Sequence, residues 1–111
     1  MLYLGNAFSL NMLDLNKDQA IIKIKKISNE EAKKILENGF LSVIGHKELA
    51  NIISKLLDIE IPTNRATIRL TSKEKMIVCQ VIGERPPEGK ILTEDELMNN
   101  YKIVFFLVEI L

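Results

Sequence analysis

The apolar run YKIVFFLVEIL at residues 101–111 restricts most strongly how this chain can fold. The run is rich in β-branched and aromatic residues, which favour a strand over a helix. It is also too short to cross a membrane as a helix, because a spanning helix needs about 20 residues. We therefore predict a strand that is buried in the core of a sheet.

Four further segments carry strand patterns, at residues 2–8, 20–27, 65–70 and 76–82. The second and third of them alternate apolar and polar side chains, as a strand with one exposed face does. The fourth is apolar except for Gln80, which predicts a central strand whose single polar side chain requires a partner or a ligand. The first contains Gly5, which weakens the strand pattern or marks a close approach of two backbones.

Capping and spacing signals predict the helices. Ser28 and Glu31 form a capping box, and Gly39 can end the helix that follows. After His46, apolar residues recur at helical spacing, so a second helix is predicted to begin at about this residue. A short third helix is predicted to start from Thr93.

Strands and helices alternate irregularly, and the chain shows no internal repeat and no low-complexity linker. Its 111 residues suit one domain, and 47% apolar residues are enough to build one core. We therefore expect a single α/β or α+β domain over residues 1–111, with a mixed sheet of about five strands covered by two or three helices.

The charge balance excludes several classes of partner. Fifteen Lys and Arg match fifteen Asp and Glu, which disfavours binding to duplex DNA and polybasic attachment to a membrane. The segment before Asp14 lacks the basic leader of a signal peptide, and its polar residues interrupt any membrane-spanning run. We expect a cytoplasmic protein with no membrane partner.

The chain contains one Cys, Cys79, and one His, His46. A lone Cys excludes an internal disulfide and fits a reducing compartment, so Cys79 is expected to act as a small apolar residue. One His and one Cys cannot supply the ligands of a zinc site, and we expect no metal and no cofactor. The sequence also lacks a Walker loop, a GxGxxG motif and a GxSxG nucleophile elbow.

Several residues are candidates for binding an anion. Arg65, Arg69 and Arg85 are the only arginines among fifteen basic residues. Arginine presents a fork of donors that grips a phosphate or carboxylate, although exposed salt bridges explain Arg65 and Arg69 equally well. His46 begins a helix, where free backbone N–H groups attract anions, and the alternative is a capping or solvated residue.

Other polar side chains have two interpretations each. Glu88 lies in the proline loop GERPPEG and is either a neighbour of His46 or a solvated turn residue. Asn6, Ser9 and Asn11 follow the first predicted strand. Their amide and hydroxyl groups can contact a nucleobase or a phosphate, or can simply build a turn.

Four segments together resemble one known family. They are MLYLGNAFSLNML at residues 1–13, VIGH at 43–46, PTNRATI at 62–68 and QVIGERPPEG at 80–89. These segments are similar to those of the type III anti-CRISPR ring nucleases, and the resemblance covers nearly the whole chain. That family occurs in viruses, proviruses and mobile elements of archaea and bacteria. It cleaves cyclic tetra-adenylate, the second messenger with which type III CRISPR systems activate defence nucleases.

The resemblance implies a metal-independent phosphodiesterase in which His46 acts as general acid. Residues matching Arg85 and Glu88 lie in the family's active site. Further matching residues contact or orient the cyclic ligand, and here they are Asn6, Ser9, Asn11, Arg65 and Gln80. No role carries over to Arg69. Gly5 stands where the family favours a small residue such as alanine.

The resemblance also implies a homodimer that holds the ring across its two-fold axis. The contact between subunits is expected from either the carboxyl-terminal strand or the second helix.

Two other interpretations remain open on the sequence. A binding protein would sequester cyclic oligoadenylate with the same arginines and asparagines without cutting it. A structural or regulatory dimer of a virus or mobile element would instead bind a protein or a duplex nucleic acid, and the zero net charge disfavours duplex DNA.

Overall fold

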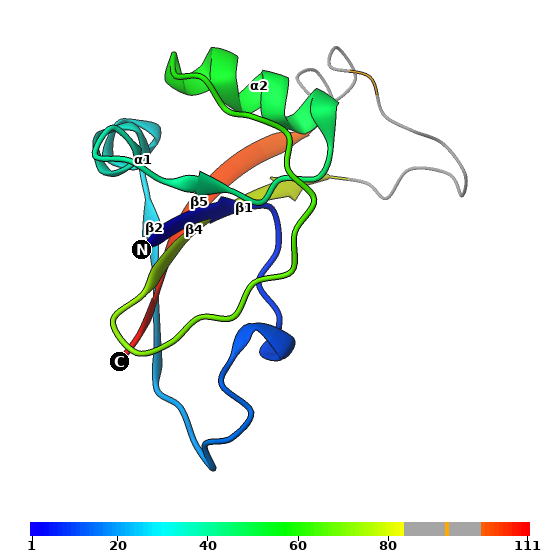
Figure 1. The fold of residues 1–111 in the computed structure, drawn as a ribbon. Coiled ribbons are helices and arrows are strands. Elements are labelled where there is room, and N and C mark those ends of the chain that lie inside the picture. The colour runs from blue at the N-terminus through cyan, green and yellow to red at the C-terminus, as the bar shows by residue number, and fades with distance from the viewer. Residues whose placement is uncertain (84–92, 94–100) are drawn as a thin grey trace.

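A mixed five-stranded sheet, with the strand order β2-β5-β4-β1-β3, forms the centre of the molecule (Figure 1). The structure is a computed structural model that describes residues 1–83, 93 and 101–111. The strands are β1 (Leu2–Gly5), β2 (Ile22–Ile27), β3 (Leu41–Ser42), β4 (Lys75–Ile82) and β5 (Lys102–Ile110). The expected α+β class and a sheet of five strands are therefore confirmed.

The directions of the strands determine which strand ends lie together. β1 runs parallel to both of its neighbours, β3 and β4, whereas β5 runs antiparallel to β4 and β2. Consequently β1, β3 and β4 all end at the same edge of the sheet, which we call the carboxyl edge. The run predicted as a buried strand is β5, and it has a paired strand on each side.

Both predicted helices in the described part of the chain are present. Helix α1 (Asn29–Leu36) begins with the predicted capping box, since the Ser28 side chain accepts from the Glu31 backbone N–H and the Glu31 carboxylate accepts from the Ser28 N–H. Gly39 follows with a φ of 106°, a conformation that favours glycine. Helix α2 (Lys47–Leu57) starts where the spacing predicted, with His46 as its N-cap residue.

The two helices cover one face of the sheet. The apolar side of α2 and two buried residues of α1, Ala32 and Leu36, pack on the strands. The strand residues in this cluster include Ile77, Cys79 and Phe105, which are fully buried. These residues lie in the same cluster because every second residue of a strand points to the same face of the sheet.

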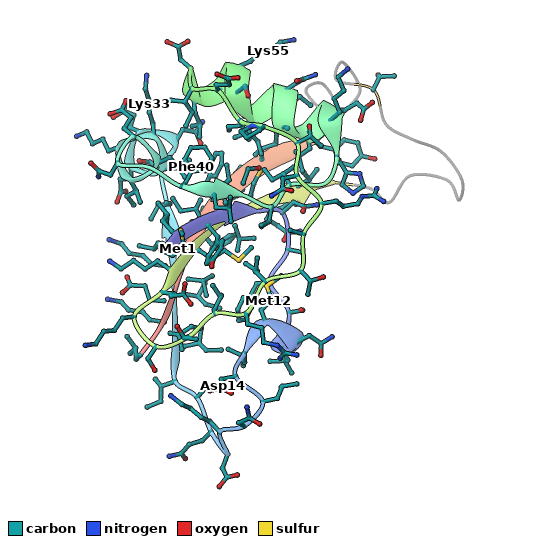
Figure 2. All side chains as sticks on the ribbon, viewed as in Figure 1. Met1, Met12, Asp14, Lys33, Phe40 and Lys55 are labelled. Atoms are coloured by element: carbon teal, nitrogen blue, oxygen red, sulfur yellow. The ribbon has the colours of Figure 1, made fainter. Side chains whose placement is uncertain are left out.

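Among the residues that the structure describes, no α-helix covers the opposite face. A short 3-10 helix, η1 (Leu10–Met12), and residues 68–70 pack on Met76, Val78 and Val108. Met12 and Asp14 lie below the sheet in Figure 2, whereas Lys55 of α2 lies above it. We refer to the two sides as the helical face and the irregular face.

The prediction of a strand at residues 65–70 is wrong. Burial alternates only over residues 67–70, where Ile68 and Leu70 are buried, because Ala66 is exposed together with its neighbours. The segment is nevertheless assigned no strand, and the Leu70 N–H donates to the Met12 carbonyl at 2.6 Å instead of to a ladder. An alternating pattern therefore shows that one side of a segment is buried. A segment that packs on a sheet can have this pattern without being a strand of it.

The other strands differ from the predictions in extent. The first predicted strand ends at Gly5, and β3 forms within the apolar run at residues 40–44. On the edge strand β2, Ile24 is 60% exposed although its alternation predicts burial, whereas Ile22 is partly buried against the cluster on the irregular face. Within the described residues, no helix is long and apolar enough to cross a membrane.

Candidate functional site

The candidate residues of the predicted site gather mainly at the carboxyl edge of the sheet. Asn6 follows β1, and the loop of residues 43–46 joins β3 to α2. Gln80 lies near the end of β4, two residues beyond Val78, which pairs with Gly5. Because these strands are parallel neighbours, three distant parts of the sequence meet at this edge.

His46 is exposed at the start of α2. Its backbone carbonyl accepts from the Ala50 N–H at 3.0 Å, as the first bond of the helix. Its side chain makes no capping hydrogen bond, so the capping alternative considered for this residue does not describe the imidazole. The ring therefore stands in solvent beside the unpaired N–H groups of the first helical turn, a position that favours an anion.

Arg65 lies directly against Gly45, the residue before His46. A Cβ atom placed on Gly45 would come within 2.9 Å of the Arg65 Cγ and 3.3 Å of its Nε. Only glycine leaves room for the arginine stem at this distance. The structure thus brings a cation against the residue that precedes the single imidazole of the chain, although Arg65 and His46 are nineteen residues apart in the sequence.

Hydrogen bonds fasten residues 62–64 to the loop that carries His46. The Asn64 side-chain amide donates to the Ser42 carbonyl at 2.8 Å, and the Asn64 backbone N–H donates to the Ile44 carbonyl at 2.8 Å. The Ser42 hydroxyl donates to the Pro62 carbonyl at 2.6 Å and accepts from the Ile44 N–H at 3.4 Å. We call these four bonds the loop clamp.

Gln80 lies on β4, which is a central strand as predicted, between β5 and β1. Its side chain is exposed, and its amide reaches only the adjacent Val81 carbonyl at 3.4 Å. This weak local contact leaves most of the amide's hydrogen-bonding capacity open to a ligand. Asn6 is partly buried where the chain leaves β1.

Ser9 and Asn11 lie on the irregular face. Ser9 is the N-cap residue of η1, and its carbonyl accepts from the Met12 N–H at 3.0 Å. The guanidinium of Arg69 donates to the carbonyls of Asn11 and Leu13, both at 3.1 Å. Arg69, to which the resemblance carries over no role, thus holds η1 in place.

Two of the predicted catalytic residues, Arg85 and Glu88, lie outside the described residues. The same holds for the short helix predicted after Thr93. The site is therefore described from His46, Arg65 and the loop clamp.

Cys79 has no part in the site. It is fully buried on the helical face, and burial raises the pKa of its thiol to about 12. The thiolate is therefore scarce near neutral pH, as the prediction of a small apolar residue requires. In the part of the chain that the structure describes, no three His, Cys, Asp or Glu side chains gather as metal ligands do.

Three residues that shape the candidate site were not predicted from the sequence. Gly45 was identified only as part of the VIGH turn, and Asn64 only as part of PTNRATI. Ser42 is 2% exposed and is the one buried polar residue of the described chain. Its position within the apolar run at residues 40–44 was a usable signal, since a buried hydroxyl needs a hydrogen-bond partner.

Comparison with protein families and with known protein sequences gives consistent matches. The family described as STIV B116-like matches residues 2–107. Uncharacterized protein 26 of Sulfolobus islandicus filamentous virus is 32% identical over 111 residues, which cover 99% of this chain and 92% of that protein. YddF of Bacillus subtilis is 40% identical over 78 residues, which cover 68% of this chain and 71% of that protein.

Among solved structures, B116 of Sulfolobus turreted icosahedral virus has the same fold. The two structures superpose with a TM-score of 0.74 and 26% sequence identity, and the match covers 97% of each chain. The likeness therefore spans the whole domain, including both faces of the sheet.

Proposed function

The chain belongs to the STIV B116-like family, and on that premise we propose that it is a metal-independent ring nuclease that cleaves cyclic tetra-adenylate. The products are linear di-adenylates with cyclic 2′,3′-phosphate ends. Its biological role is then to remove the messenger of type III CRISPR defence in the cytoplasm of the host. The proposal rests on the resemblance of four sequence segments to the anti-CRISPR ring nucleases and on the site at the carboxyl edge.

One observation supports the proposal most strongly. The only imidazole of the chain stands uncapped and exposed at the start of α2, with the Arg65 stem against the preceding Gly45. A phosphodiester needs a cation near its anionic oxygens and a group that can donate a proton to the leaving oxygen. His46, at the start of α2, and Arg65, in the segment after α2, provide these two groups.

The reaction requires little beyond alignment and protonation, because the substrate carries its own nucleophile. The 2′-oxygen attacks phosphorus, the bond from phosphorus to the 5′-oxygen breaks, and the 2′-hydroxyl loses its proton to solvent or a base. Protonated His46 donates a proton to the departing 5′-oxygen, which leaves as a hydroxyl. No water, metal or oxidant is consumed, and the bonds and charges balance.

The remaining roles follow the resemblance. Arg85 stabilises charge on the phosphoryl oxygens, and Glu88 orients His46. Asn6, Ser9, Asn11, Arg65 and Gln80 hold or orient the ring. A homodimer would present two copies of His46 to opposite phosphates, since a ring of four adenylates has two-fold symmetry. Two cuts release two di-adenylates.

The test is to incubate the protein with radiolabelled cyclic tetra-adenylate in excess EDTA and to resolve the products. Cleavage to di-adenylate with cyclic phosphate ends is expected. His46→Ala should lower the single-turnover rate by roughly 10²-fold to 10⁴-fold while keeping most of the affinity. Asn51→Ala, at an exposed position on the same helix, is the matched control and should cleave as the wild type does.

Two outcomes would replace the proposal. Wild-type protein that binds the ring tightly but leaves it intact would be a sequestering protein, and His46→Ala would then bind equally well. Protein with no affinity for the ring, but with steeply salt-dependent affinity for a duplex, would point to the regulatory dimer instead.

A further inference from the structure

Arg65 is held against Gly45, the residue before His46. Among the residues that the structure describes, Arg65 has no hydrogen-bond or ion-pair partner, and its Cγ and Nε lie against Gly45. The backbone that carries it is instead fixed one residue earlier, where Asn64 bonds to both Ser42 and Ile44. The guanidinium is thus free to bind, whereas its attachment point is held.

We propose that Asn64 is a positioning residue, which holds the Arg65 stem on Gly45 so that the guanidinium is ready for a ring phosphate. This inference rests on the proposed function for the identity of the ligand, but not for the contact itself. Asn64 touches neither the ligand nor the reacting atoms, and it acts through Arg65.

The physical reason is the entropy of a long side chain. An unrestrained arginine loses much rotamer freedom when it grips a phosphate. A stem that already rests on Gly45 has lost part of that freedom during folding, so less is lost on binding. Asn64 uses both its backbone and its side-chain donor to keep the two segments at this distance, since both of its bonds end on residues 42–44.

The first experiment needs no ligand. The ¹⁵N–¹H nuclear Overhauser effect of the Arg65 Nε–H reports how restrained the side chain is, and the spectrum of Arg65→Ala assigns the signal among the three arginines. We expect a restrained Nε in the wild type and in Asn51→Ala, and a mobile one in Asn64→Ala. Equal restraint in Asn64→Ala, with the protein folded, would overturn the proposal.

The second experiment measures affinity for the 2′-deoxy form of cyclic tetra-adenylate, which lacks the nucleophile and stays intact. Arg65→Ala should weaken binding by roughly 10-fold to 100-fold, and Asn64→Ala by about 5-fold. Because Asn64 acts through Arg65, adding Asn64→Ala to Arg65→Ala should change the affinity no further. Additive losses would mean that Asn64 acts by another route, and the proposal would be wrong.

Gly45→Ala provides a second variant that leaves both Asn64 bonds in place. The new methyl group meets the Arg65 Cγ at 2.9 Å and must displace the stem, so the Nε should become mobile and affinity should fall as in Asn64→Ala. An unchanged Arg65 signal in this variant would also contradict the proposal. If the wild type has no affinity for the ring, the proposed function fails, and the ligand-free spectra still decide the role of Asn64.

Discussion

The helical face and the irregular face of the sheet are covered by different kinds of structure. On the helical face, α1 and α2 pack their apolar sides on β4 and β5, and each helix is defined by its own caps and spacing. On the irregular face, η1 and residues 68–70 are held by contacts between segments far apart in the sequence, such as the bond from Leu70 to Met12. Local signals specify the first cover, and long-range contacts specify the second.

The same contrast separates two arginines of one segment. Arg65 lies against Gly45 at the carboxyl edge, and Arg69 donates to two carbonyls of the η1 segment on the irregular face. They are four residues apart and both exposed, yet only Arg69 has hydrogen-bond partners among the described residues. Residue type and exposure therefore do not separate a binding arginine from a structural one.

The largest effects on stability are expected from buried residues in the segments that pack on the two faces of the sheet. Leu57→Ala on the helical face and Leu70→Ala on the irregular face remove buried leucines that are 2% and 1% exposed. Each should lower the free energy of unfolding by about 2–5 kcal/mol. Leu57→Ala should cost more, because a regular helix relaxes less into a cavity than an irregular segment does. Denaturant unfolding measures both, and a larger loss for Leu70→Ala would break the distinction between the two covers.

Arg65→Ala should affect ligand binding without affecting stability. Loss of a charged donor to a phosphate corresponds to about 1.5–3 kcal/mol, or roughly 10-fold or more in affinity. The free energy of unfolding should stay within about 0.5 kcal/mol of the wild type, as for other exposed substitutions. Calorimetry with the uncleavable ring and denaturant unfolding give the two numbers, and Lys34→Ala on α1 controls for loss of one charge.

Arg69→Ala should show the opposite behaviour. It removes two hydrogen bonds to the η1 segment and should lower the free energy of unfolding by about 1 kcal/mol. Affinity for the ring should fall less than in Arg65→Ala, because Arg69 acts on the ring only through the segment that carries Ser9 and Asn11. A variant that unfolds like the wild type but binds the ring as weakly as Arg65→Ala would place Arg69 itself in the site.

Ser28→Ala tests the helical face, where local signals specify the helices. It removes one half of the capping box of α1 and should lower the free energy of unfolding by about 1 kcal/mol. The change should add to that of Arg69→Ala, because the two sites lie on opposite faces and share no contact. Coupling between them, measured in the double variant, would mean that the two covers do not fold independently.

The smallest effect concerns acid stability on the irregular face. The Glu74 carboxylate accepts from the Thr71 N–H and hydroxyl at 2.8 and 2.7 Å, and these bonds lower its pKa below the usual 4.5. A pKa lowered by folding adds stability above the unfolded value that is lost as the pH falls through the folded value. As the pH falls from about 5 to about 3, the free energy of unfolding should therefore decrease slightly more in the wild type than in Glu74→Gln. Equal losses would contradict this assignment.

The sequence predicted those parts of the fold that local signals determine. The capping box at Ser28, the start of α2 at His46 and the buried strand that is β5 all depend on residues close together in the chain. The predicted strand at residues 65–70 failed because alternation records which side is buried and not which neighbour completes a ladder.

The geometry of the candidate site was predicted only in part for the same reason. The helix start at His46 was predicted because it is a local signal, and the expectation that this position attracts an anion follows from it. That Arg65 lies on Gly45, and that Asn64 and Ser42 hold it there, depends on contacts across about twenty residues. Spacing alone gives no means to distinguish this arrangement from two unrelated exposed residues.

The most direct test of the account is a crystal structure of the protein with the 2′-deoxy form of cyclic tetra-adenylate. The measured quantity is the distance from the nearest His46 ring nitrogen to a 5′-oxygen of the ring. A general acid must lie within hydrogen-bond reach, about 2.6–3.2 Å, or act through one water, and we predict such a contact. An imidazole beyond both would contradict the catalytic role of His46, and with it the proposed reaction.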